Sequence, residues 1–299
     1  MRASWLVSLL RRAVGVVGAK GIGGPRSMRL AAEPRAIMRI PYGGYWPGLG
    51  HQITTLCYVL LHCQESRVYP VLQDDSANAY GAWTDYFEPF WDESERQRIL
   101  AKDGLEIIDS DLHWARNRKG LFGDRWSSLG PQIEEIFRRI FVVREPVLSE
   151  IGDRIARLDL PLGYSSVHVR RGDKTVQFAE YGAMTTEHVV GELARVLRSH
   201  GVEDVFLMTD EAEVLEIMRR STPFQVHSLC PADADGDPQR IRTASGHMMN
   251  LLTDIMIAQR AHAHFQTVNS RVSKLVRLLR EDRDCFHVFD PLYTVYTKL

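Results

Sequence analysis

The hydrophobic and polar positions of this chain follow two periods, one typical of strands and the other typical of helices. In the first half, short apolar runs predict strands, and apolar stripes with helical spacing predict helices. The predicted strands span residues 36–41 and 68–72, and the predicted helices span 51–66, 94–102, 131–141 and 147–158. The stripe of the helix over 51–66 consists of Ile53, Leu56, Cys57, Leu60 and Leu61.

The second half alternates more regularly. Its predicted strands span 165–170, 204–209, 224–229, 263–268 and 285–289, and its predicted helices span 186–200, 211–220, 246–261 and 270–281. Asp210 followed by Glu213 is a capping-box signature for one helix start, and Gly201 is a typical stop for another helix. Strands that alternate with helices predict an α/β fold with parallel sheets, and these five strands predict a Rossmann-like unit.

The helical period stops near Pro161, which predicts a boundary between two α/β lobes with a cleft between them. We expect an unstructured or targeting-like leader at 1–35, an N-terminal α/β lobe with a glycine-rich loop at 36–160, and the Rossmann-like lobe at 161–299. The leader is basic and rich in glycine, and its apolar start is short for a secretory signal.

Composition narrows the class of protein. The 299 residues are 44% hydrophobic and 25% charged, as in soluble globular proteins, and the net charge of -1 provides no general attraction for nucleic acid. No run reaches the roughly 20 apolar residues of a transmembrane span. The four cysteines form no C-x-x-C pair, so a zinc ribbon is not expected and Cys57 and Cys63 are interpreted as core residues. A reducing, cytoplasmic location fits best.

Residues 166–174 read SVHVRRGDK, an apolar strand that ends in charged groups. At the carboxyl edge of a parallel sheet, such groups face the crevice where ligands bind. The planar fork of arginine matches phosphate oxygens, so Arg170 and Arg171 predict a site for a diphosphate. His168 shares the pleat phase of Arg170. One arginine is expected to face the ligand while the other pairs with Asp173; the alternative is a plain surface cluster of charges.

A second candidate for anion binding is the turn Gly48-Leu49-Gly50-His51-Gln52, which precedes a predicted helix. Glycine allows close approach of the backbone to a ligand, and N–H groups at a helix start attract anions. The turn is neither a Walker loop nor a full G-x-G-x-x-G, because Ile53 stands where the third glycine belongs. A tight turn without a ligand is the alternative.

Two further candidates lie near the carboxyl end of the chain. Asp254 sits in a strongly apolar helix, where a buried carboxylate needs hydrogen-bond donors such as the two parallel N–H groups of guanine. Asn250 is only a partial partner, and a solvent-facing aspartate is the alternative. Ser270 and Arg271 lie at a strand-to-helix junction, where the serine is an ordinary N-cap and where a phosphate would also bind.

Taken in this order, these motifs resemble the α1,6-fucosyltransferase family, which includes the animal N-glycan core enzyme and the rhizobial Nod-factor enzymes. Residues 168–174 are similar to the family's hallmark, and residues 48–52 are similar to its donor loop. Asp254 and Ser270 have the spacing of the family's guanine-reading aspartate and phosphate-contacting serine. The segment with Phe286, His287, Asp290 and Tyr293 is also similar, and the likeness covers about residues 37–295.

The resemblance implies a GT-B-like fold and inverting transfer of fucose from GDP-fucose, with no metal and no cofactor beyond this donor substrate. It implies that Arg170 binds the β-phosphate, that His168 contacts the nucleotide and that Asp254 reads guanine. The expected donor-binding residues are Gly48, Gly50, His51, Gln52, His168, Arg170, Arg171, Asp210, Asp254, Ser270 and Arg271.

The chain departs from the family pattern at the general base, because Phe178 stands where the family has a glutamate. Glu180 is the expected substitute, with Asp173 and Lys174 as orienting groups beside Arg170 in the catalytic set. We expect no stem, membrane anchor or extra domain of the kind found in the animal enzymes, and therefore a compact bacterial enzyme that acts on a lipo-oligosaccharide or another glycan.

Three other functions are alternatives. A different nucleotide-sugar donor keeps the fold, and a catalytically inactive GDP-sugar-binding protein would explain the displaced glutamate. A nicotinamide dehydrogenase is disfavoured by the incomplete glycine fingerprint.

Overall fold

The computed structural model describes residues 33–42, 48–74, 81–109, 128–171, 182–230, 246–267, 270–282 and 284–289. The chain divides into two compact units, Met1–Glu150 and Ile151–Leu299, and the division falls within helix α8 (Glu145–Arg157). No helix in the described part of the chain combines the length and the apolar character that crossing a membrane requires.

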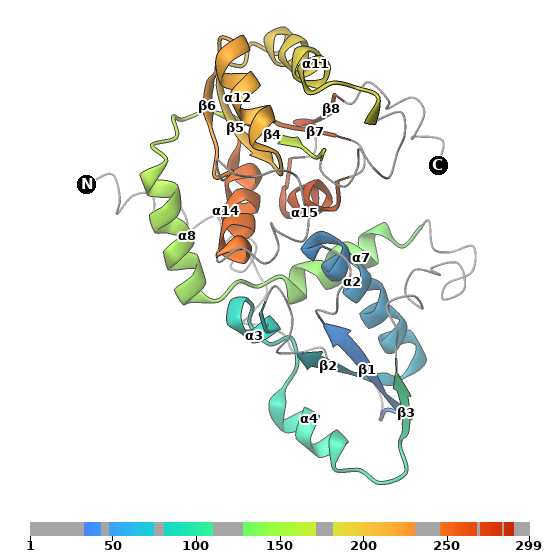
Figure 1. Cartoon of the computed structure of the whole chain (residues 1–299). Coiled ribbons are helices and arrows are strands. Elements are labelled where there is room, and N and C mark those ends of the chain that lie inside the picture. The colour runs from blue at the N-terminus through green and yellow to red at the C-terminus, as the bar shows by residue number, and fades with distance from the viewer. Residues whose placement is uncertain are drawn as a thin grey trace. The chain divides into compact units, whose positions relative to one another are not determined.

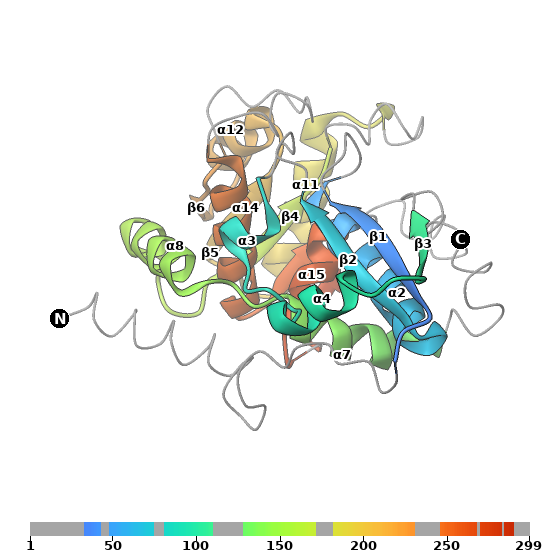
Figure 2. The same ribbon diagram turned by 90° about the horizontal axis from the view of Figure 1, so that it is seen from below.

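The first unit contains a three-stranded parallel sheet. Strands β1 (Ala36–Tyr42), β2 (Val68–Asp74) and β3 (Glu106–Asp109) lie in the order β2-β1-β3. Helix α2 (Leu49–Ser66) connects β1 to β2 and packs against both strands and against α7 (Gly130–Ile140) (Figure 2). Two shorter helices, α3 (Trp83–Tyr86) and α4 (Glu93–Leu100), follow β2.

Helix α2 is buried over most of its length because it packs against the sheet and against α7. The predicted apolar stripe is buried, and Cys57 and Cys63 are free thiols in the core, which confirms their interpretation as core residues. Burial raises the pKa of the Cys63 thiol to about 12, and the Cys63 Sγ atom lies 3.7 Å from Sδ of Met38.

The second unit has the predicted Rossmann-like organisation. Its parallel sheet has the order β6-β5-β4-β7-β8, with β4 (Ser165–Val169) at the centre. The flanking strands are β5 (Asp204–Thr209), β6 (Gln225–His227), β7 (His264–Gln266) and β8 (Phe286–Val288). Helices α11 (Thr186–Ser199) and α12 (Ala212–Ser221) cover one face, and α14 (His247–Arg260) and α15 (Arg271–Leu279) cover the other (Figure 1).

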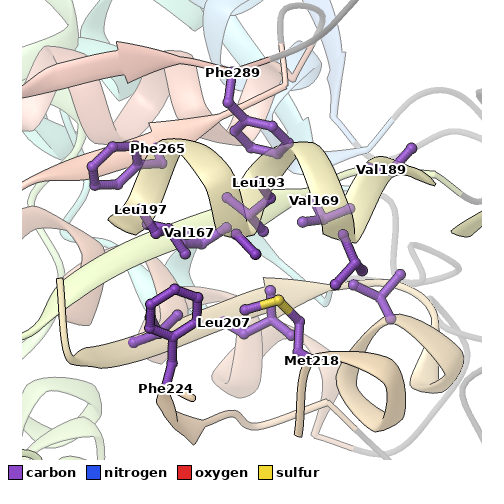
Figure 3. Packing of buried hydrophobic residues seen from close by; sticks show 14 of the residues in the cluster. Val167, Val169, Val189, Leu193, Leu197, Leu207, Met218, Phe224, Phe265 and Phe289 are labelled. Carbon is purple, nitrogen blue, oxygen red and sulfur yellow. The ribbon is translucent and has the colours of Figure 1, made fainter. Parts of the chain in front are cut away.

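The face under α11 and α12 is apolar. Because successive strand residues point to opposite faces, Val167 and Val169 of β4 point to the same side as Phe265 of β7. Figure 3 shows these side chains packed with Leu193 and Leu197 of α11, all of them buried. We call this side of the sheet the apolar face. Beyond α11, Gly201 has a φ of +65°, which confirms its prediction as a helix stop.

The opposite face of the same strands is polar. In the register of β4 with β7, Ser166 lies beside His264 and His168 lies beside Gln266, and all four side chains are buried. We call these four residues the polar face. It lies under α15, where Ser270 and Ser273 contact its histidines.

Candidate functional site

Arg170 and Arg171 follow directly after β4, at the carboxyl edge of the sheet. Nη1 of Arg170 lies 3.3 Å from Oδ2 of Asp210, and the side chain of Arg170 remains 26% exposed. The backbone N–H of Arg171 donates to Oδ1 of the same aspartate at 3.1 Å. Asp210 comes directly after the neighbouring strand β5, so one buried carboxylate holds both the side chain of Arg170 and the backbone of Arg171.

The two arginines differ in orientation. Arg171 is buried, with Nε 3.3 Å from Oε2 of Glu211 and Nη2 donating to the carbonyl oxygen of Met184 at 3.0 Å. Burial and the nearby Asp210 raise the pKa of Glu211, and the charge of Arg171 opposes that rise. Arg171 therefore ties β4 to the start of α12, while Arg170 keeps contact with solvent at the sheet edge.

The predicted capping box of Asp210 and Glu213 is wrong. Glu211 is the N-cap residue of α12, and its side chain makes no capping hydrogen bond. Asp210 is instead engaged by Arg170 and Arg171, and Glu213 accepts a hydrogen bond from the Thr186 hydroxyl at 2.6 Å. Asp210 and Glu213 therefore bond to residues of other segments, and not to the backbone N–H groups at the start of α12.

His168 lies on the polar face, immediately before the arginine pair. Its Nδ1 atom lies 2.8 Å from Oγ of Ser270 and 2.8 Å from Oγ of Ser273. Burial, with the nearby charge of Arg170, lowers the pKa of His168 to about 3, so the imidazole is neutral at physiological pH. Ser270 also accepts a hydrogen bond from the backbone N–H of Ser273 at 3.2 Å, which confirms it as the N-cap of α15.

Asp254 lies in the middle of α14. The residue as a whole is half-buried, but its Oδ1 atom is shielded from solvent and has no hydrogen-bond partner among the described residues, so this oxygen does not face solvent. Burial raises the pKa of its carboxyl group well above the usual range. Asn250, the expected partial partner, accepts instead from Nη1 of Arg154 at 2.6 Å. Helix α14 packs against β4, β5 and α15, the elements that carry or adjoin His168, Asp210 and Ser270.

In the first unit, the predicted glycine turn is shorter than expected. Gly48 is the N-cap of α2, whereas Gly50, His51 and Gln52 already belong to its first turn. The carbonyl of Gly48 accepts from the N–H of His51 at 2.9 Å, and the carbonyl of Gly50 accepts from the Thr54 hydroxyl at 2.8 Å. The helix therefore begins at Leu49, two residues before the predicted start at position 51. A helix start still presents N–H groups suited to an anion.

Several predicted site residues lie outside the described residues. These are Asp173, Lys174, Phe178, Glu180, Asp290 and Tyr293. Arg271 is described and begins α15. Across the described ranges, no group of three or more His, Cys, Asp or Glu side chains is arranged to hold a metal ion.

The structure also adds residues that the sequence reasoning missed. Ser273 and His264 join His168 in one hydrogen-bonded group, and Glu211 holds Arg171. Gln266 is buried next to His168, and its Oε1 atom has no partner among the described residues. A signal for His264 and Gln266 was available: the predicted strands 165–170 and 263–268 carry polar residues two positions apart, at 166 and 168 and at 264 and 266, which indicates a polar face.

The two α/β units, each with a sheet of parallel strands, have the class of fold found in GT-B fucosyltransferases with Rossmann-like domains. The structure is similar to NodZ α1,6-fucosyltransferase soaked with GDP-fucose, with a TM-score of 0.50 and 15% identity over 83% of this chain and 93% of that chain. The structure of fucosyltransferase NodZ from Bradyrhizobium matches with a TM-score of 0.52 and 17% identity, over 83% of this chain and 94% of that chain. The apo form of POFUT1 matches with a TM-score of 0.52 and 11% identity, over 87% of this chain and 99% of that chain.

These likenesses confirm the predicted fold class. They extend across NodZ and POFUT1 alike, so they support a fucosyltransferase-like fold in general and do not single out the α1,6 family. No protein-family model matches the chain, and no curated protein matches it by sequence.

Proposed function

We propose that this chain is a glycosyltransferase that moves fucose from GDP-fucose to a hydroxyl group of a glycan or lipo-oligosaccharide. In this proposal the transfer inverts the configuration at the anomeric carbon of the sugar and uses no metal. The fold supports it, because solved structures with that fold include NodZ soaked with GDP-fucose and POFUT1 in complex with GDP, the latter with a TM-score of 0.51. The α1,6-type hallmark at residues 168–174 supports fucose as the sugar.

The observation that carries the proposal is the buried, unsatisfied carboxylate oxygen of Asp254. A buried acceptor without a donor costs about 1–3 kcal/mol, and more when it is charged. Guanine supplies two parallel N–H donors, from its ring nitrogen and its exocyclic amine, and a carboxylate accepts both. Uracil and adenine do not present this pair, so Asp254 would select a guanine nucleotide.

The diphosphate would bind at the edge of the sheet in the second unit. Arg170 offers its guanidinium there, and Ser270 marks the start of α15, where backbone N–H groups favour an anion. His168 would add a neutral imidazole N–H. We include Gly48 and Gly50, at the start of α2, as further predicted donor contacts.

Transfer breaks the bond between the sugar carbon and the β-phosphate oxygen while the acceptor oxygen bonds to that carbon from the opposite side. Negative charge grows on the departing β-phosphate, and a guanidinium held ready by Asp210 stabilises it. The proton of the acceptor hydroxyl passes to a general base, for which Glu180 is the proposed residue.

A nucleotide screen tests the donor half of this proposal. GDP should raise the melting temperature of the full chain by linkage, whereas UDP and ADP at equal concentration should not. Asp254→Asn and Arg170→Ala should each reduce the GDP shift. Arg219→Ala is a matched control, because Arg219 is exposed in the last turn of α12 and should leave the shift unchanged.

Turnover tests the catalytic half. Release of GDP from GDP-fucose, measured with a panel of glycan and lipo-oligosaccharide acceptors, should depend on the acceptor. A rise in melting temperature with GDP, without acceptor-dependent release of GDP, would indicate a protein that binds GDP-sugars but does not transfer them. Equal shifts with UDP and GDP would overturn the assignment of Asp254.

A further inference from the structure

A chain of buried hydrogen bonds connects His168 to side chains of α15, β7 and β4. Nε2 of His264 lies 3.3 Å from Oγ of Ser273, and Nδ1 of His264 lies 2.7 Å from Oγ of Ser166. The same Ser273 hydroxyl lies 2.8 Å from Nδ1 of His168. Ser166, His264, Ser273 and His168 therefore form a continuous hydroxyl–imidazole chain, which we call the relay. Each member is at least nine-tenths buried.

The start of the relay sets its direction. The Ser166 hydroxyl has two acceptors within reach, Nδ1 of His264 at 2.7 Å and the carbonyl oxygen of Ala263 at 3.4 Å. The shorter contact has the geometry of a good hydrogen bond, whereas the longer one is near the limit. Either atom of the shorter contact can carry the hydrogen, and the relay takes the direction in which Ser166 donates to Nδ1 of His264.

The remaining steps follow from the chemistry of neutral imidazole, in which one nitrogen donates and the other accepts. With Nδ1 accepting, His264 carries its hydrogen on Nε2 and donates it to the Ser273 oxygen. The Ser273 hydroxyl hydrogen then points to Nδ1 of His168. As a result, His168 carries its own hydrogen on Nε2, the nitrogen turned away from the relay.

The relay also affects Ser270. Two hydroxyls, those of Ser270 and Ser273, converge at 2.8 Å on the single Nδ1 atom of His168, which has one lone pair. Because Ser273 satisfies that lone pair, the hydroxyl hydrogen of Ser270 is available for another acceptor. The Ser270 oxygen meanwhile keeps its capping bond from the Ser273 backbone N–H.

We propose that Ser166, His264 and Ser273 are positioning residues, which hold the hydrogen of His168 on Nε2 and release the Ser270 hydroxyl for an anionic ligand oxygen. The site then presents two donors to an acceptor-only diphosphate without reorganisation on binding. The identity of the ligand rests on the proposed function, whereas the direction of the relay does not.

The direction is tested on the full chain without nucleotide. Nitrogen-15 NMR of histidine-labelled protein reports which ring nitrogen carries the hydrogen, with His168 and His264 assigned from single His→Gln variants. We expect the hydrogen on Nε2 of both rings. A hydrogen on Nδ1 of His168 would overturn the proposal.

Two adjacent serines of β4 provide a matched pair of variants. Ser166→Ala removes the first donor of the relay, so both histidines should become mixtures of tautomers. Ser165→Ala removes an equally buried hydroxyl with the pleat phase of Val167, and it should leave the NMR spectrum of the histidines unchanged. Equal effects of the two variants would indicate a packing role alone and would contradict the proposal.

GDP affinity, measured by calorimetry, tests the consequence for binding. In Ser273→Ala, the Ser270 hydroxyl donates to Nδ1 of His168 and is lost to the ligand. GDP should therefore bind about two- to tenfold more weakly, which corresponds to one net hydrogen bond. Ser273→Thr keeps a hydroxyl and should restore the affinity. If GDP fails to bind the parent chain, the proposed function fails while the NMR result still decides the relay. If GDP binds and Ser166→Ala leaves the tautomers unchanged, the relay alone fails.

Discussion

The two faces of the central sheet in the second unit have opposite chemistry, although the same strands build both. On the apolar face, Val167, Val169 and Phe265 bury hydrocarbon against α11 and α12 (Figure 3). On the polar face, His168 and His264 are equally buried, but they bond to serines of β4 and α15. The apolar face gains stability from burial, whereas on the polar face the hydrogen bonds of the histidines and serines offset the cost of removing these groups from water.

The difference shows how one strand serves two purposes. Residues of odd number in β4 stabilise the unit, and those of even number lead to the ligand edge at Arg170. Substitutions on the apolar face should therefore change the free energy of unfolding alone. Substitutions on the polar face and its surroundings should change nucleotide binding as well.

The largest expected effect is on the apolar face. Phe265→Ala removes a fully buried ring and should lower the free energy of unfolding by about 3–5 kcal/mol, measured by urea denaturation. Phe265→Leu keeps most of the volume and should cost less, so it serves if the alanine variant does not fold. Both variants should bind GDP with unchanged affinity once folded; a loss of affinity would break the separation of the two faces.

The next effect is at the sheet edge. Arg170→Ala should slow acceptor-dependent release of GDP from GDP-fucose by about 10²–10³-fold, because a preorganised donor to the developing charge is lost. Arg170→Lys keeps a positive charge beside Asp210 but loses the planar fork, so it should recover stability more than rate. Rates equal to the parent in both variants would remove Arg170 from the catalytic set.

Asp254→Asn should change binding and stability in opposite directions. Loss of charge-assisted hydrogen bonds to guanine should weaken GDP binding by about 10- to 100-fold, measured by calorimetry. At a pH above the raised pKa of Asp254, the same change removes a buried, uncompensated carboxylate, so the free energy of unfolding should rise there. A variant that binds GDP as tightly as the parent would contradict the role of Asp254.

The raised pKa of Asp254 also predicts a dependence on pH. The folded chain holds this proton more tightly than the unfolded chain, and the difference contributes to the free energy of unfolding. This contribution is complete below a pH of about 3.8 and is lost as pH rises through the pKa of Asp254 in the folded chain. GDP needs the ionised carboxylate, so its affinity should rise with pH across the same window, by at most about tenfold per pH unit. Asp254→Asn should abolish this part of the pH profile.

The smallest effect compares two helix caps. The Thr185 side chain accepts a hydrogen bond from the N–H of His188 at the start of α11, on the apolar face, and Ser270 caps α15 in the same way on the polar face. Thr185→Ala and Ser270→Ala should each cost about 1 kcal/mol of stability. Only Ser270→Ala should also weaken GDP binding. Equal binding by both variants would show that Ser270 is a cap without a ligand role.

The sequence by itself determined the order and type of most elements, because the periods of strands and helices are local properties of neighbouring residues. It also placed Arg170 at a strand end and Ser270 at a helix start, where a few adjacent residues suffice for the inference. The alternation of polar residues in β4 and β7 was equally visible.

The tertiary structure alone decided which partners these residues meet. Asp210 was expected to cap its own helix, but it holds Arg171 across 39 positions of the chain, and His168 meets Ser273 across 105. Whether Asp254 is buried or exposed also depended on which face of α14 packs against the strands and α15. Such contacts depend on strand order and register, which bring distant segments together and cannot be read from the residues next to them.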